Sequence, residues 1–91
     1  MKHLPANVES YKKTPEFTET TVPDGLLKDH QTKEGVWGKI VILEGSLEYT
    51  ILEPDEEVIK LTENNCGVVE PIILHHIKPL GRVRFYVEFY R

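Results

Sequence analysis

The sequence lacks any long segment in which apolar residues recur at the helical period, and it lacks a clustered run of basic residues. The first absence argues against a helical bundle or an α/β fold. The second argues against nucleic-acid binding, because a polyanion is bound by a clustered basic face. The formal charge of −4 also has the wrong sign for a nucleic-acid partner.

Cysteine and long apolar runs are scarce as well. Cys66 is the only cysteine, which excludes an internal disulfide framework and favours a reducing compartment. The N-terminal segment has no apolar leader, and no run approaches the roughly 18 apolar residues of a membrane span. These absences predict a soluble, cytoplasmic protein without a membrane partner.

Motifs for several chemistries are missing. There is no glycine-rich phosphate loop, no serine nucleophile elbow and no paired-cysteine metal motif, so nucleotide-dependent and hydrolase functions have no support. Cys66 lies in a predicted turn, where it is either a reactive thiol or an ordinary turn cysteine. The absence of an adjacent basic residue favours the ordinary cysteine.

The most apolar part of the chain is residues 35–52. An almost unbroken apolar run at 36–43 is followed by Glu44-Gly45-Ser46 and by an alternating run at 47–52. This pattern predicts a β-hairpin that reverses at Gly45, with a first strand packed on both faces. Trp37 is then either a core residue or part of a cavity wall.

Short strands are predicted along the rest of the chain, separated by turns rich in Pro, Gly, Asn and Asp. The predicted strands are 17–22, 26–32, 58–62, 72–77 and 83–91, and the main turns are 23–25, 63–67 and 78–81. Residues 1–16 are predicted to form an irregular arm with at most one short edge strand. The 91 residues suffice for a single all-β domain, 1–91, built as a small barrel or jelly-roll sandwich of about seven or eight strands.

The last predicted strand has two distinct faces. One face is apolar and is predicted to join the core: Val83, Phe85, Val87 and Phe89. The other is aromatic and charged: Arg84, Tyr86, Glu88 and Tyr90. This second face suits a subunit interface, the wall of a polar cavity or a half-exposed sheet surface.

Two histidines are the candidate ligands of a functional site. His30 and His75 lie in different predicted strands, and they can face one cavity if these strands are neighbours. Two neutral imidazoles from separate strands are a common start for a divalent metal site, although strand histidines are more often packed or surface residues. His76 must face away from His75, because adjacent residues on a strand point to opposite sides.

Three spaced motifs resemble one known family. They are His30-x-Thr32-x-x-Gly35-x-Trp37, Lys39-Ile40-x-x-Leu43-x-Gly45-x-Leu47 and Val69-Glu70-Pro71-x-x-x-His75. Together they resemble the small cupin domain found at the N-terminus of tellurite-resistance TehB proteins and in stand-alone YeaR-like proteins. The resemblance covers residues 14–91 and implies a small cupin-type β-barrel of the jelly-roll type, with a cavity.

The resemblance also implies a metal site in which His30 and His75 hold the first and last ligand positions of the general cupin pattern. Thr32 and Trp37-Gly38 stand where that pattern has a second histidine and a glutamate. A divalent ion, zinc first and iron, nickel or manganese next, is therefore expected on His30 and His75. Water or a carboxylate from Glu34, Glu70 or Glu88 would complete its coordination, and Thr32, Trp37 and Tyr86 are further candidates for the cavity lining.

Two functions follow as expectations. The first is a metal-binding domain for tellurite or oxyanion stress, whose open coordination positions take a small anionic ligand. The alternative is a metal-free module that binds a small ligand or a partner protein. The resemblance also implies a homodimer, whereas the methyltransferase activity of TehB proteins belongs to another domain and is not expected of these residues.

Overall fold

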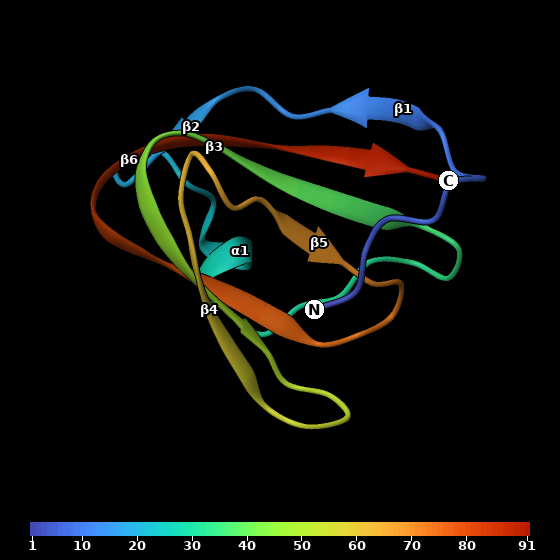
Figure 1. The fold of residues 1–91 in the computed structure, drawn as a ribbon. Helices are drawn as coiled ribbons and strands as arrows, with labels where there is room; N and C mark the ends of the chain where they lie inside the picture. The colour runs from blue at the N-terminus through green and yellow to red at the C-terminus, as the bar shows by residue number, and fades with distance from the viewer.

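Two long antiparallel strands, β3 (Trp37–Ile51) and β6 (His75–Tyr90), form the centre of the fold in the computed structural model, which describes residues 1–91. They pair with each other along nearly their whole length and lie side by side in Figure 1. On the other edge of β3, β5 (Gly67–Val69) pairs with its first half and β4 (Glu57–Leu61) with its second half. β1 (Ser10–Lys13) and β2 (Phe17–Thr18) pair with the free edge of β6.

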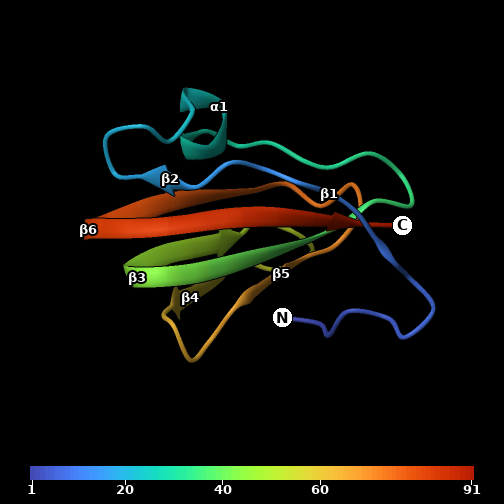
Figure 2. The same cartoon turned by 90° about the horizontal axis from the view of Figure 1, so that it is seen from above.

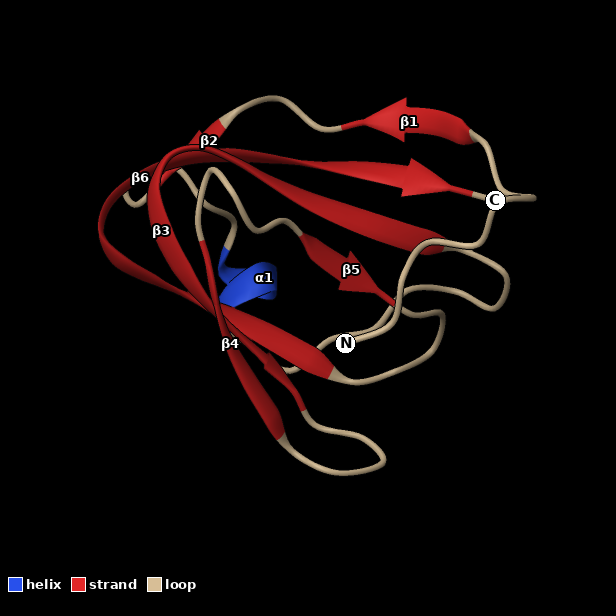
Figure 3. Cartoon of the chain, viewed as in Figure 1, coloured by secondary structure: helices blue, strands red, loops and turns tan.

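All six strands belong to one antiparallel sheet, and the only helix is one turn long (Figure 3). The prediction of an all-β domain is therefore confirmed. The sheet is open, because its strand path β1-β6-β3-β4 ends at two strands that do not pair with each other. The edge strand allowed for in the N-terminal arm is β1, while β4 confirms the strand predicted at 58–62 to within one residue at each end.

Both halves of β3 bury side chains in the same core, although the parity of the buried residues changes along the strand. Ile40 and Ile42 are buried before Gly45, whereas Leu47, Tyr49 and Ile51 are buried after it. The register with β6 shifts at the same place, between Ile42 and Leu47, which is the effect of a β-bulge. The apolar face predicted for the last strand is confirmed, since Val83, Phe85 and Val87 are buried and Phe89 packs against the core.

The predicted hairpin at Gly45 is wrong. Residues 37–51 form one continuous strand because both of its halves pair with β6 instead of with each other. The turn predicted at 78–81 is likewise absent, since β6 passes through Pro79 and Gly81 opposite the bulge in β3. The first half of β3 is also not packed on both faces, because Val41 and Leu43 are half-exposed on its outer side.

Two further strand predictions are wrong for local reasons. The segment 17–22 is a strand only at Phe17–Thr18, because the amides of Thr21 and Val22 donate to the carbonyl of Thr18 at 3.2 and 3.0 Å and close a turn. Threonine side chains that bond nearby backbone groups compete with a sheet ladder in this way, as Thr21 Oγ1 does by accepting from the Thr18 amide.

The segment predicted as a strand at 26–32 contains instead the end of α1 (Asp24–Leu27) and two isolated bridges at His30 and Thr32. Pro23 precedes the helix and accepts a bond from the Leu26 amide, and Leu26 packs against the core. Figure 2 shows α1 beyond β2 and β6, on the side away from β4. The chain contains no helix with the length and apolar character needed to cross a membrane.

Candidate functional site

The structure brings together the two histidines that the sequence analysis singled out. His30 lies in the segment after α1, and His75 is the first residue of β6. Their backbones form a two-way bridge, in which each amide donates to the carbonyl of the other residue at 2.9 Å. The centroids of the two imidazole rings are 4.1 Å apart, and the ring planes are inclined by 58°.

The hydrogen bonds of the two rings define which nitrogen remains available. His30 Nδ1 lies 2.8 Å from the carbonyl oxygen of Lys28, and His75 Nδ1 lies 2.9 Å from that of Ile73. A carbonyl oxygen only accepts, so in each ring Nδ1 carries the proton and donates. Both Nε2 atoms are then lone-pair donors, and neither has a hydrogen-bond partner within the protein.

The surroundings of His75 keep its ring neutral. Its side chain is buried, and this burial lowers the pKa from 6.5 to about 4; the hydrogen bond to the Ile73 carbonyl opposes this shift, and the proximity of His30 and His76 adds to it. The ring of Tyr49 packs edge-on against His75 at 5.7 Å, and its hydroxyl donates to the Val68 carbonyl. Burial raises the pKa of Tyr49, so this hydroxyl keeps its proton and holds its position.

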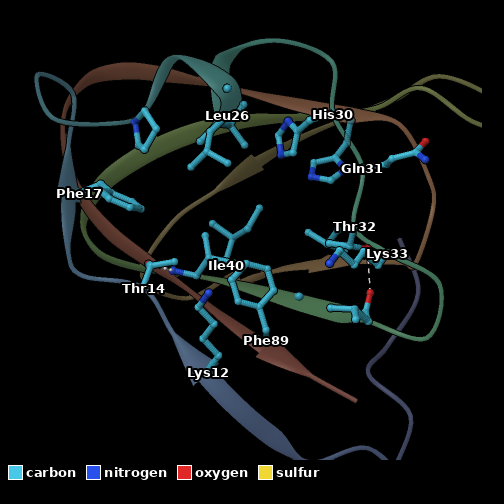
Figure 4. A pocket seen from close by; sticks show the side chains of 18 of the residues that line it. Lys12, Thr14, Phe17, Leu26, His30, Gln31, Thr32, Lys33, Ile40 and Phe89 are labelled. Carbon is cyan, nitrogen blue, oxygen red and sulfur yellow. Dashed lines mark hydrogen bonds between the residues drawn. The ribbon is translucent and has the colours of Figure 1, made fainter.

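Both histidines line a cavity of about 590 Å³ between α1, the N-terminal strands and the concave side of the sheet (Figure 4). Its walls are largely apolar and include Phe17, Leu26, Ile40, Ile77, Val87 and Phe89. This volume lies within the range of small-molecule sites, which are mostly apolar with a few polar groups that orient the ligand. The arrangement can therefore bind a small molecule and present two imidazole nitrogens to it.

The other predicted site residues lie apart from the histidine pair, except for Thr32. Thr32 lines the cavity, and its hydroxyl donates to the Val36 carbonyl at 2.7 Å. Glu70 lies in a second hollow, where it pairs with Lys2 at 2.7 Å. Trp37, which does not line the cavity, lies on the outer side of β3, and the sequence-based proposal of a cavity wall for it is wrong.

The outer face of β6 carries the remaining candidates. Glu88 accepts a hydrogen bond from Ser10, which is the main reason why its pKa is lowered, and Tyr86 lies under the ammonium group of Lys13. Neither residue lines the cavity that contains His30 and His75. The prediction that His75 and His76 cannot both face the cavity is confirmed, since His76 faces away from it and its Nδ1 lies 2.9 Å from Asp29 Oδ1.

No group of three or more His, Cys, Asp or Glu side chains is arranged to hold a metal ion. The histidine pair is thus the largest cluster of such ligands at the cavity, and Glu34 is exposed and not part of its lining. Cys66 is half-buried in the connection between β4 and β5 and also lies outside the lining.

A family model described as the TehB-like domain matches residues 12–87, a span that contains both histidines. The chain belongs to the TehB-like family. This assignment confirms the family that the three sequence motifs resemble.

Among curated proteins, the chain is 32% identical over 75 residues to the "Probable S-adenosyl-L-methionine-dependent methyltransferase TehB" of Haemophilus influenzae Rd. The match covers 78% of the chain and 26% of that relative. The same protein from Haemophilus influenzae strain 10810 is 30% identical over the same length. The chain therefore spans about a quarter of the length of the curated relatives that it matches.

Two crystal structures have similar folds. A protein from E. coli K12 superposes with a TM-score of 0.89 at 22% identity, over 100% of this chain and 97% of that one, which shows the shared fold. TehB from Haemophilus influenzae superposes with a TM-score of 0.82 at 29% identity, over 93% of this chain and 32% of that one. The TehB-like domain is thus the region of TehB that this chain resembles.

Sequence reasoning missed several residues of the TehB-like domain that line the cavity. Lys12, Gln31 and Lys33 contribute polar groups, and Phe17 and Leu26 contribute apolar walls. The pair Lys12-Lys13 carries no recognisable pattern by itself. Lys12 reaches the cavity because it pairs with Phe89 across the β1–β6 ladder, and such a pair shares one face of the sheet. The position of Lys12 at the cavity therefore follows only from the pairing of strands that are distant in the sequence.

Proposed function

We propose that this TehB-like domain binds a divalent metal ion through Nε2 of His30 and of His75 and offers its open coordination positions to a small anionic ligand in the cavity. The observation that carries the proposal is the pair of adjacent imidazoles whose Nδ1 atoms are both bonded to backbone carbonyls. Such second partners orient ligating histidines and fix the tautomer that leaves Nε2 free.

The donor set fits a weakly held ion. Imidazole suits zinc, iron and nickel. Two nitrogens that each lie about 2 Å from one ion are at most about 4 Å apart, a separation similar to the 4.1 Å between the centroids of the two rings. A neutral His75 at pH 7 has no proton to lose before it binds the ion. Because no third protein ligand is arranged beside the pair, water or the ligand would fill the other positions, and the affinity is expected to be modest.

A metal-free binding site is the second candidate, and the residues that line the cavity favour it. The walls are largely apolar, and two protein ligands are fewer than the three that hold zinc in catalytic sites. In this case His30 and His75 accept hydrogen bonds from the ligand through Nε2. Binding of the ligand would then survive removal of all metal.

Membership of the TehB-like family supports a biological role that is compatible with either function. The relatives are named TehB, and the sequence motifs resemble those of tellurite-resistance TehB proteins, which supports a role in cytoplasmic stress caused by tellurite or related oxyanions. The bend of β3 and β6 around one core supports the proposal that the sheet is a variant of the cupin jelly roll. The methyltransferase activity named for the relatives is not proposed for a chain that matches about a quarter of them.

The test is zinc titration by calorimetry together with elemental analysis, on protein purified without a metal-affinity column. We expect one zinc per chain, with affinity reduced at least about tenfold in the double variant His30→Ala, His75→Ala. His76→Ala is the matched control, because His76 adjoins His75 but pairs with Asp29 outside the cavity. Zinc binding that the double variant retains would contradict the proposal, as would wild-type protein that takes up none.

A further inference from the structure

The charge on the cavity wall is opposite to the charge on the chain. The chain has fifteen acidic and eleven basic residues, yet none of the 19 residues that line the cavity is an aspartate or a glutamate. Lys12 and Lys33 are the only lysine or arginine residues of the lining. Five of the fifteen acids instead line the second hollow: Glu53, Asp55, Glu56, Glu57 and Glu70.

Neither lysine of the cavity is neutralised by the protein. The ion pairs of the structure are formed by the N-terminal amine, Lys2, His76 and Arg84. Lys12 and Lys33 form none of them, and both side chains are exposed at the rim. An anion bound at this rim would not have to displace a carboxylate of the protein, and low-dielectric walls strengthen its attraction to the two ammonium groups.

The interior of the cavity determines what kind of uncharged body the ligand can have. In Figure 4, Lys12 and His30 lie on opposite sides of the cavity, with Ile40 and Phe89 between them. An inorganic oxyanion held by the two lysines would leave most of the 590 Å³ unfilled, and deeper in the cavity it would lose its hydration against apolar walls without compensation. A ligand with an apolar body would instead bury that body against these walls.

We propose that the cavity selects an organic monoanion with a compact apolar body, such as an aromatic carboxylate, over inorganic oxyanions. Its charged group lies at the rim with Lys12 and Lys33, and its body contacts Phe17, Leu26 and Phe89. This inference rests on the proposed function in taking the cavity as the ligand site, but it places the charged group at the two lysines instead of on the metal ion and does not depend on that ion.

The test uses calorimetry on the full chain in the presence of EDTA, with benzoate, its uncharged analogue benzamide and inorganic sulfate as probes. We expect benzoate to bind more tightly than benzamide, and sulfate at equal concentration not to displace it. In the double variant Lys12→Met, Lys33→Met, benzoate should bind about two- to fivefold more weakly per lysine removed, with benzamide unchanged. Methionine keeps the apolar stem and removes the charge.

The matched control is the double variant Lys60→Met, Lys78→Met, which removes the same charge from exposed positions outside the cavity. Its affinity for benzoate should equal that of the wild type. Equal binding of benzoate and benzamide, no binding of benzoate at millimolar concentration, or equal losses in both double variants would overturn the inference. Loss of zinc binding alone would overturn only the metal site, since the lysine-dependent binding is measured without metal.

Discussion

His75 combines two properties that rarely occur in one histidine. The residue is only 3% exposed, yet its Nε2 has no partner within the protein and its ring lines a cavity. Burial lowers its pKa to about 4, so the ring is neutral at physiological pH. A neutral imidazole in an apolar wall can accept a metal ion or a hydrogen bond, and it costs the fold far less free energy than the protonated ring would.

The stability of the metal-free protein is therefore expected to fall on acidification. The unfolded chain binds a proton at His75 with a pKa near 6.5, whereas the folded chain does so at about 4. Between these values the unfolded state holds more protons, so the free energy of unfolding decreases as the pH falls from 6.5 to 4, by at most about 3 kcal/mol from this residue. Urea denaturation in EDTA across this range measures the change.

The variant His75→Gln isolates the contribution of His75 from that of the acidic residues. Its free energy of unfolding should depend less steeply on pH between 4 and 6.5 than that of the wild type. His76→Gln, which removes the neighbouring half-exposed imidazole, serves as the control. An identical pH dependence in the wild type and His75→Gln would contradict the burial of a neutral ring.

At the level of elements, the bend in β3 depends on one glycine. Gly45 has a φ of +80°, and a Cβ at this position would lie 2.0 Å from the carbonyl oxygen of Arg82 in β6. The bulge allows Ile42 before the bend and Leu47 after it to face the same core. Without it, one half of the strand would turn its apolar residues to solvent.

Gly45→Ala should therefore destabilise the fold by about 3 kcal/mol or more, because it combines an unfavourable φ with a clash against backbone. Gly81→Ala is the matched control, since Gly81 has a φ of +92° but nothing within 4 Å of the added Cβ, and it should cost about 1 kcal/mol. Denaturant unfolding of both variants gives the comparison. Equal losses of stability would show that the close approach to Arg82 is unimportant.

At the scale of the whole molecule, the outer side of the sheet remains partly uncovered. Across the β3–β6 ladder Trp37 is paired with Tyr90 and Val41 with Tyr86, and all four are half-exposed. Lys39 and Glu88 are paired between them, so the face carries both signs of charge beside apolar groups. A face of this kind can meet a copy of itself across a two-fold axis.

The homodimer predicted from the sequence is expected to use this face. Light scattering should then give twice the chain mass of 10.5 kDa, and Tyr86→Glu should reduce it to one chain by placing a charge in the contact. Leu80→Glu, at an exposed site elsewhere on β6, should leave the dimer intact. A wild-type mass of one chain would contradict the prediction.

The sequence by itself determined the all-β class, the family, the buried face of the last strand and the two histidines. These properties depend on local periodicity and on spaced motifs, which are visible without knowing which strands pair. For the same reason the sequence correctly predicted that His76 faces away from His75, since neighbouring residues of a strand always point to opposite sides.

Only the tertiary structure decided that β3 and β6 are continuous, that Trp37 and Glu88 lie outside the cavity, and that Lys12 lies at its rim. A glycine between two apolar runs is equally suited to a tight turn and to a bulge, and the choice depends on which distant strand supplies the hydrogen bonds. Because β6 pairs with both halves of β3, the chain bends at Gly45 within one strand instead of reversing there. The same long-range pairing determines which residues line the cavity, including the lysines that a bound ligand would contact.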